Sequence, residues 1–175
     1  ANKKRRRMKP SMRSVFLMLA VLLSLSCERD DICIDETTPK LIIRFYDFEN
    51  PELFKDVANL KVNIEGADGD YINETITTLT DSIALPINVV GNQTRFTLTL
   101  QENEILEQEE NADILEITYT QEDVFVSRPC GYKAIFNEVV PDLEKDEDNW
   151  IDDIVPLKDP LDINNESSAH VKIYH

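Results

Sequence analysis

Apolar and polar residues alternate along most of the chain from Leu41 onward. The alternation is clearest in three runs, at residues 60–65, 96–101 and 115–120. Successive side chains of an extended chain point to opposite faces of a sheet, so a period of two predicts strands with one buried face. Weaker runs of the same kind lie at residues 41–47, 83–89, 124–128, 132–139, 151–157 and 169–174.

Turn-forming residues separate these runs, at residues 66–70, 91–92, 111–113 and 164–165. No window shows the sustained apolar period of 3.6 residues that a long amphipathic helix requires. Many short strands with regular turns are typical of β-sandwiches, and residues 41–175 are enough for one buried core. We therefore expect an all-β fold over residues 41–175, a single immunoglobulin-like antiparallel β-sandwich of about seven to nine strands.

The first 26 residues have the order of a secretory signal peptide. Basic residues cluster before residue 14, an uncharged apolar run covers residues 14–26, and its last residue, Ser26, is small. The run is shorter than the roughly 20 apolar residues that a helix needs to cross a bilayer. We expect residues 1–26 to be a signal peptide. Residues 1–7 are a candidate over-extended start, since Met8 or Met12 could open a signal of ordinary length.

Ser26 directly precedes Cys27, and this arrangement resembles the lipobox of bacterial lipoproteins, in which the cysteine is acylated and becomes the mature N-terminus. Ser24 stands where the usual pattern has leucine, which fits the looser lipoboxes of Bacteroidota. The resemblance implies a lipid on Cys27, and residues 27–40 then form a polar leash. The alternative is an ordinary signal peptide, with Cys27 in a disulfide or at the surface.

The charge of the chain limits its partners. The sequence holds 18 basic and 34 acidic residues, and residues 1–26 contain seven of the basic ones and no acidic one. A chain that starts at Cys27 therefore keeps 11 basic and 34 acidic residues, a formal net charge of −23. Nucleic acids and anionic head groups are bound through Lys and Arg, so we expect neither as a partner, and we expect the lipid alone to hold the protein at the membrane.

Three cysteines occur in the sequence. If Cys27 carries lipid, Cys33 and Cys130 are the natural disulfide pair in an oxidising compartment. Two unpaired thiols, or a Cys27–Cys33 bond with Cys130 free, are the alternatives. Cys130 has the same strand parity as Tyr132, Ala134 and Phe136, which places its sulfur on the core side if the pattern holds. A zinc site is not expected, because neither cysteine has a neighbouring histidine or a Cys-x-x-Cys spacing.

Residues typical of catalysis are few. The four glycines, at positions 66, 69, 91 and 131, cannot build a phosphate-binding loop, and no serine lies in a Gly-x-Ser-x-Gly motif. Both histidines, His170 and His175, lie near the C-terminus, and strand parity turns His170 toward solvent. We expect no enzymatic activity and no cofactor, and a hydrolase that uses paired carboxylates is the remote alternative.

The acidic stretch at residues 141–153 contains two candidate features. Asp142, Glu144 and Asp146 have the spacing of the first calcium ligands of an EF-hand, but Glu147 stands where that loop needs glycine, so they are weak metal candidates. Such a run is more often a solvated connection. Trp150, the only tryptophan, is a candidate contact for a partner or a sugar. The alternative is that Trp150 caps the edge of the core.

The stretches ICIDETTPKLIIRFYDFENP, DSIALPI and RPCGYKAIFNEV resemble a family of uncharacterised lipoproteins of flavobacteria and their relatives. The resemblance implies a membrane address and a fold, and no activity. Glu28, Asp30 and Asp31 are similar to the signals that send Bacteroidota lipoproteins to the outer face, but Arg29 departs from that pattern. The periplasmic face and the cell surface both stay open. Residues 81–83 match the O-glycosylation motif of that phylum, with Ser82 as the acceptor.

From these features we expect an outer-membrane lipoprotein that acts by binding. The function expected first is that of an accessory subunit in a larger cell-envelope complex, with a protein partner in the envelope. The alternative is a solitary surface module that binds glycan or calcium.

Overall fold

The computed structural model describes residues 32–34, 37–65, 71–76, 79–100 and 111–175, and it describes the side chains of all but residues 71–76. The chain divides into two units, Ala1–Ile32 and Cys33–His175, and all the strands belong to the second. The predicted signal peptide, Cys27, the acidic residues that follow it and the turn at 66–70 lie outside the described residues. In the described ranges, no helix has the length and apolar character needed to span a membrane.

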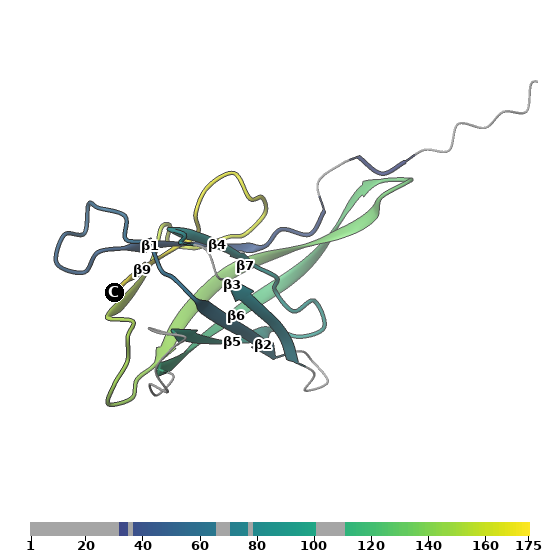
Figure 1. The fold of residues 1–175 in the computed structure, drawn as a ribbon. Helices are drawn as coiled ribbons and strands as arrows, with labels where there is room; N and C mark the ends of the chain where they lie inside the picture. Colours follow the sequence, from purple (N-terminus) through teal and green to yellow (C-terminus); the bar gives the residue numbers. More distant parts are fainter. Residues whose placement is uncertain (1–31, 35–36, 66–70, 77–78, 101–110) are drawn as a thin grey trace, which may run out of the picture. The chain divides into compact units, whose positions relative to one another are not determined.

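Nine strands in the described residues form two sheets (Figure 1). The sheet with the order β4-β1-β9-β8 is built from β1 (Leu41–Tyr46), β4 (Ser82–Leu85), β8 (Asp153–Pro156) and β9 (Val171–Tyr174). The sheet with the order β3-β2-β5-β6-β7 is built from β2 (Leu60–Glu65), β3 (Tyr71–Ile76), β5 (Gln93–Leu100), β6 (Asn111–Ser127) and β7 (Gly131–Glu144). The predicted all-β sandwich is confirmed. It departs from a purely antiparallel arrangement at one pair, β1 and β9, which run parallel.

The core lies between the inner faces of the two sheets. Every second residue of β1 and β2 is buried, as the apolar period of two predicted. The largest fully buried side chains are those of Phe45, Phe96 and Phe136. Burial of one such side chain stabilises the fold by about 1.5–3 kcal/mol relative to its exposure. The apolar alternation is therefore the main determinant of this fold.

Three predicted details of the strands are wrong. Residues 115–120 and 124–128 belong to one strand, β6, because hydrogen bonding to β7 continues through the polar residues between them. The turn predicted at residues 111–113 is the start of β6, where Asp113 pairs with Leu98 of β5. Strand β3 was not predicted at all, although it pairs with β2 along its full length.

The outer edge of β7 is covered by the segment that contains Leu161 and Ile163. The Phe136 and Ile163 backbones exchange two hydrogen bonds, of 3.0 and 2.7 Å, and the Val139 N–H donates to the Leu161 carbonyl at 2.8 Å. At the bulge between these contacts, Glu138 has a φ of 52° and its N–H donates to the Asp162 carboxylate at 3.0 Å. Such covering protects a long edge strand from pairing with other chains.

His170 is buried, and its predicted exposure to solvent is wrong. The residue lies just before β9 and acts as a strand partner of β1: its N–H donates to the Ile42 carbonyl at 2.8 Å, and its Nδ1 accepts the Ile42 N–H at 2.9 Å. Nδ1 is therefore unprotonated, and Nε2 donates to the Asn165 carbonyl at 2.9 Å. Parity failed here because the imidazole itself takes part in the backbone pairing.

Candidate functional site

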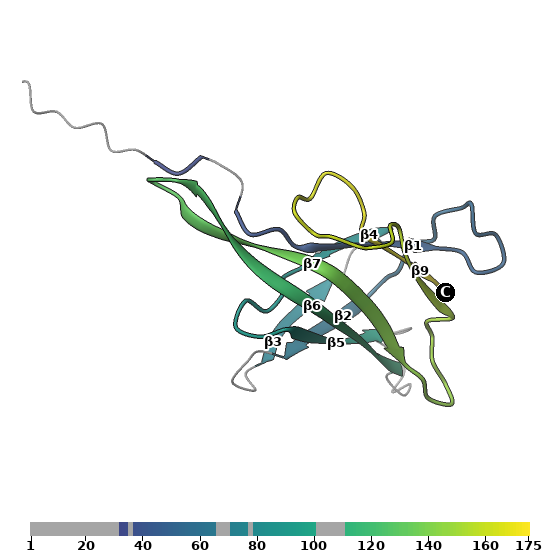
Figure 2. The same ribbon diagram turned by 180° about the vertical axis from the view of Figure 1, so that it is seen from behind.

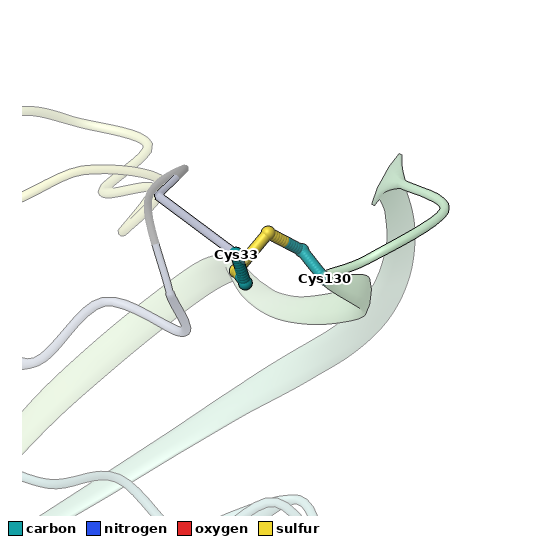
Figure 3. Close-up of a disulfide and its surroundings, with 2 residues drawn as sticks. All are labelled: Cys33 and Cys130. Atoms are coloured by element: carbon teal, nitrogen blue, oxygen red, sulfur yellow. A yellow bond between two sulfur atoms is a disulfide. The ribbon is translucent and has the colours of Figure 1, made fainter. Parts of the chain in front are cut away.

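A disulfide joins Cys33 to Cys130, in the turn between β6 and β7 (Figure 3). The two residues are 97 positions apart in sequence, and their Cα atoms are 4.8 Å apart. The predicted pairing is confirmed, and it rules out both alternatives, the free thiols and the Cys27–Cys33 bond. The predicted place of Cys130 on the core side is wrong, because the turn lies past the end of the core and Tyr132 on the same side is 70% exposed.

The hairpin of β6 and β7 runs well past the rest of its sheet (Figures 1 and 2). The last residue of β6 that pairs with β5 is Thr118, opposite Gln93. Beyond the Tyr119 N–H, which donates to the Asn92 carbonyl at 3.0 Å, β6 pairs only with β7 in the described part of the chain. We call residues 124–133, the far end of this hairpin, the hairpin tip.

The hairpin tip exposes a pair of aromatic rings. Phe125 and Tyr132 are directly opposite in the β6–β7 register, and their ring centroids lie 5.4 Å apart in a T-shaped arrangement. Their side chains are 56% and 70% exposed, and Ile34, next to the disulfide, is 90% exposed. The pair continues the face that carries the buried Ala134 and Phe136. The tip thus presents apolar surface that the core does not use.

The end of the predicted leash is attached to the sandwich. Two contacts add to the disulfide of Cys33. The Thr38 hydroxyl accepts the Ala134 N–H at 3.1 Å, and the Pro39 side chain is buried. The Lys40 N–H donates to the Glu166 carboxylate at 2.9 Å. The predicted leash of residues 27–40 is therefore attached to the hairpin from Cys33 on.

Trp150 packs against the core and is half-buried. Its indole N–H donates to the Leu98 carbonyl at 2.9 Å, and its ring centroid lies 6.3 Å from that of Phe45 and 5.6 Å from that of His175. The ring thus caps the edge of the core, as one of the two interpretations predicted. A partner contact through Trp150 stays a prediction, restricted to the part of the ring that remains exposed.

Asp113, near the start of β6, joins the acidic stretch at residues 141–153 to the sheet. Its side chain has no solvent exposure, and its Oδ2 accepts the Ile151 N–H at 2.8 Å, whereas its Oδ1 has no hydrogen-bond partner among the described residues. Burial raises the pKa of Asp113, and the hydrogen bond from Ile151 opposes that shift. Sequence reasoning missed this residue because it was assigned to a turn.

The three weak metal candidates do not form a cluster. Glu144 forms an ion pair with Arg95, whereas Asp142 is exposed on β7 beside Glu116 of β6. Asp146 accepts the Asp148 N–H at 3.1 Å in the turn that follows β7. Within the ranges that the structure describes, no group of three or more His, Cys, Asp or Glu residues is arranged to hold a metal ion.

Ser82, the candidate acceptor for O-glycosylation, is half-buried at the start of β4. Its hydroxyl donates to the Ile43 carbonyl at 3.1 Å, and its N–H donates to the Thr80 hydroxyl at 3.2 Å. The neighbouring Asp81 forms an ion pair with Arg44 at 3.5 Å. The motif is thus part of the β1–β4 pairing, and modification of Ser82 stays a prediction.

His175 also has a structural environment. The His175 ring lies edge-on to Phe45 at 5.9 Å, and its Nε2 is 3.5 Å from the Lys55 carbonyl. The Lys55 ammonium donates to the His175 carbonyl at 2.7 Å. Burial lowers the pKa of both His175 and His170. Each imidazole is thus held by contacts within the fold.

Sequence reasoning did not single out the aromatic pair of the hairpin tip. Phe125 lies five residues before Cys130 and Tyr132 two residues after it, but both fall in predicted strands where apolar residues normally face a core. Their exposure follows from the length by which the hairpin exceeds β5. No local pattern reports that length.

The fold and site together define a β-sandwich whose longest hairpin is tied by a disulfide to the segment that precedes the first strand. The family of unknown function DUF6452 matches residues 59–175, and the chain belongs to this family. No curated protein and no solved structure shows significant similarity to the chain.

Proposed function

We propose that this protein is an exported lipoprotein of the Bacteroidota type, anchored in the outer membrane through an acylated Cys27. The observation that carries the proposal is the Cys33–Cys130 disulfide, since disulfides persist in exported proteins and are rare in the cytosol. The basic, apolar and small segments that precede Cys27 support the same address.

Within that address, we propose that the protein acts by binding, as an accessory subunit of a larger envelope complex. The sequence has no glycine-rich phosphate loop and no Gly-x-Ser-x-Gly motif, and both of its histidines make structural contacts. The net charge of −23 for a chain from Cys27 favours a protein partner with a basic surface over an anionic one.

The first experiment is the intact mass of the protein purified from membranes of its native host, measured with and without reductant. We expect a chain that starts at Cys27, carries acyl groups, and gains the mass of two hydrogens on reduction. A mature chain that begins before Cys27, or one without acyl groups, would refute the anchor.

A co-purification from the same extract in mild detergent tests the accessory role. We expect one protein to accompany the chain in a fixed ratio. The matched comparison is the Cys27→Ser variant, which should lose the membrane fraction and keep the disulfide. If no companion persists in mild detergent, the accessory role is wrong even where the anchor is right.

A further inference from the structure

We propose that the hairpin tip rests in the interfacial region of the bilayer, with Phe125 and Tyr132 among the lipid head groups, and that this contact orients the sandwich. The inference rests on the proposed function, because it takes the bilayer to be the one in which the acylated Cys27 is anchored. The sequence alone indicated that the lipid would be the only membrane contact.

The tip has the chemistry of an interfacial anchor. Tyrosine and tryptophan are enriched at membrane interfaces, where an apolar ring contacts lipid and a polar group stays in water, and Tyr132 combines both properties. Phe125 packs against it, and Ile34 adds apolar surface beside the disulfide. Arg128, exposed in the turn at the very end, places a cation nearest to the head-group phosphates.

The acidic residues of the hairpin lie behind the aromatic pair. Glu122 and Asp123 pair with Ile135 and Ala134, further from the turn than Phe125 and Tyr132. The order from the turn inward is therefore a cation, an aromatic pair and then acids. The net negative charge of the chain disfavours broad adhesion to anionic lipid, so the contact that we propose is a local apolar one.

The disulfide keeps the tip within reach of the bilayer. Cys33 follows Cys27 by six positions, so the lipid-bearing residue is at most about 22 Å from the disulfide, whatever the conformation between them. Cys130 is itself in the turn of the hairpin tip, two residues from Tyr132. Without the disulfide, the first attachment of the leash is at Thr38, and the tether grows to eleven residues and about 40 Å.

The contact would fix which end of the molecule faces the bilayer. Two rings bury little apolar surface compared with acyl chains, so the lipid holds the protein and the tip orients it. The open end of the hairpin, where Ile114 pairs with Glu144, then points away from the membrane. A strand rises about 3.3 Å per residue, which puts this open end roughly 40 Å from the tip.

The test places a tryptophan at the tip of the full-length, acylated protein. The Phe125→Trp variant is reconstituted into phosphatidylcholine vesicles whose acyl chains either carry bromine, a fluorescence quencher, or do not. We expect its emission to shift to shorter wavelength and to lose intensity in the brominated vesicles. The parent protein supplies the background of Trp150, whose indole packs against the core.

Three further variants make the result specific. Tyr132→Trp is a second reporter of the tip, in case Phe125→Trp disturbs the hairpin. Val140→Trp is the matched control, since Val140 lies on β7 with 58% exposure but pairs with Thr118 in the body of the sheet, and we expect no quenching there. Cys33→Ser combined with Cys130→Ser and Phe125→Trp lengthens the tether and should reduce the quenching.

The outcomes separate this inference from the proposed function. An acylated protein that floats with the vesicles but shows no quenching of either tip reporter would overturn the tip contact and leave the anchor standing. A shift of the emission that depends on protein concentration, without quenching, would show that a second copy covers the tip, and would also overturn the contact. A chain without acyl groups would refute the anchor and the tip contact together.

Discussion

Asp113 is a buried carboxylate whose Oδ2 accepts the Ile151 N–H, and this contact holds the acidic stretch on the sheet. Its pKa is raised by burial above the ordinary value of 3.8. The folded state therefore binds the proton more tightly than the unfolded state. The stability that Asp113 contributes is complete below pH 3.8 and falls as the pH rises through the pKa of the folded state.

The variant Asp113→Asn should keep the hydrogen bond and remove the buried charge. We expect its free energy of unfolding, relative to the parent, to be higher at pH 7 than at pH 4, measured by urea unfolding at both values. Asp113→Ala is the control, because it leaves the Ile151 N–H without an acceptor and should cost about 1–3 kcal/mol at both values. A larger loss for Asp113→Asn at pH 7 than at pH 4 would contradict a buried charge.

His170 should make the fold sensitive to mild acid. Burial lowers the pKa of His170, so the unfolded state binds protons more readily, and the stability from the neutral ring is complete above about pH 6.5 and lost as the pH falls below it. We expect the urea midpoint of the parent to fall between pH 7.5 and pH 5.5. His170→Ala should cost about 1–3 kcal/mol at pH 7.5 and show a weaker fall, with the remainder due to His175. If the urea midpoint of His170→Ala falls with pH as steeply as that of the parent, His170 is not the source of the sensitivity to acid.

The leash segment stabilises the hairpin through a contact that one hydroxyl makes. The Thr38 hydroxyl accepts the N–H of the buried Ala134 on the outer edge of β7. Thr38→Val keeps the shape of the side chain but leaves that N–H without a partner, and we expect a loss of about 1–3 kcal/mol in urea unfolding. Thr37→Val is the matched control, since Thr37 is exposed, and its effect should stay within about 0.5 kcal/mol. Equal effects of the two variants would mean that the Thr38 contact contributes nothing.

At the scale of the strands, the sequence predicted what the core dictates. The alternation predicted for β2 is confirmed along the whole strand, because one face of β2 packs on the core. In β5 it is confirmed at Phe96 and Leu98 but is wrong at the end of the strand, where Thr99 is buried and Leu100 is only half-buried. It failed in β6 beyond Tyr119, where residues 120–123 are polar on both faces because the hairpin has left the core. Backbone hydrogen bonding to β7 maintains the strand at residues 120–123, and the side chains of these residues show no alternation that would predict a strand.

The candidate site shows the same division. The Cys33–Cys130 bond could be predicted without knowledge of the fold, since it follows from the number of cysteines, the predicted lipid on Cys27 and the predicted oxidising compartment. For Trp150 the sequence left two interpretations, a cap on the core edge or a contact for a partner. The sequence cannot distinguish them, because it does not show whether the indole N–H donates within the fold, as it does to the Leu98 carbonyl, or to a partner. The aromatic pair at the tip depends on how far two strands outrun their neighbour, which is a property of the assembled sheet.

Positive and negative charges are segregated along the sequence. The basic residues of positions 1–26 precede Cys27, and the sandwich that follows carries nearly all of the negative charge. Three described ion pairs, which Arg44 and Arg95 form with Asp81, Glu116 and Glu144, offset little of it, because each is partly exposed and such pairs contribute about 0–1 kcal/mol. Repulsion among the remaining acids should therefore govern how this protein responds to salt.

A chain that starts at Cys27 should become more stable as salt is added. Between 0.01 and 0.1 M ionic strength the Debye length falls from about 30 to about 10 Å, which screens repulsion across the sandwich more than it screens the ion pairs at contact distance. We expect the urea midpoint to rise with NaCl over this range at pH 7.5. The matched control is pH 4, where protonation of many carboxylates should flatten the dependence. A midpoint that falls with NaCl at pH 7.5 would mean that the ion pairs around Arg95 outweigh the net charge.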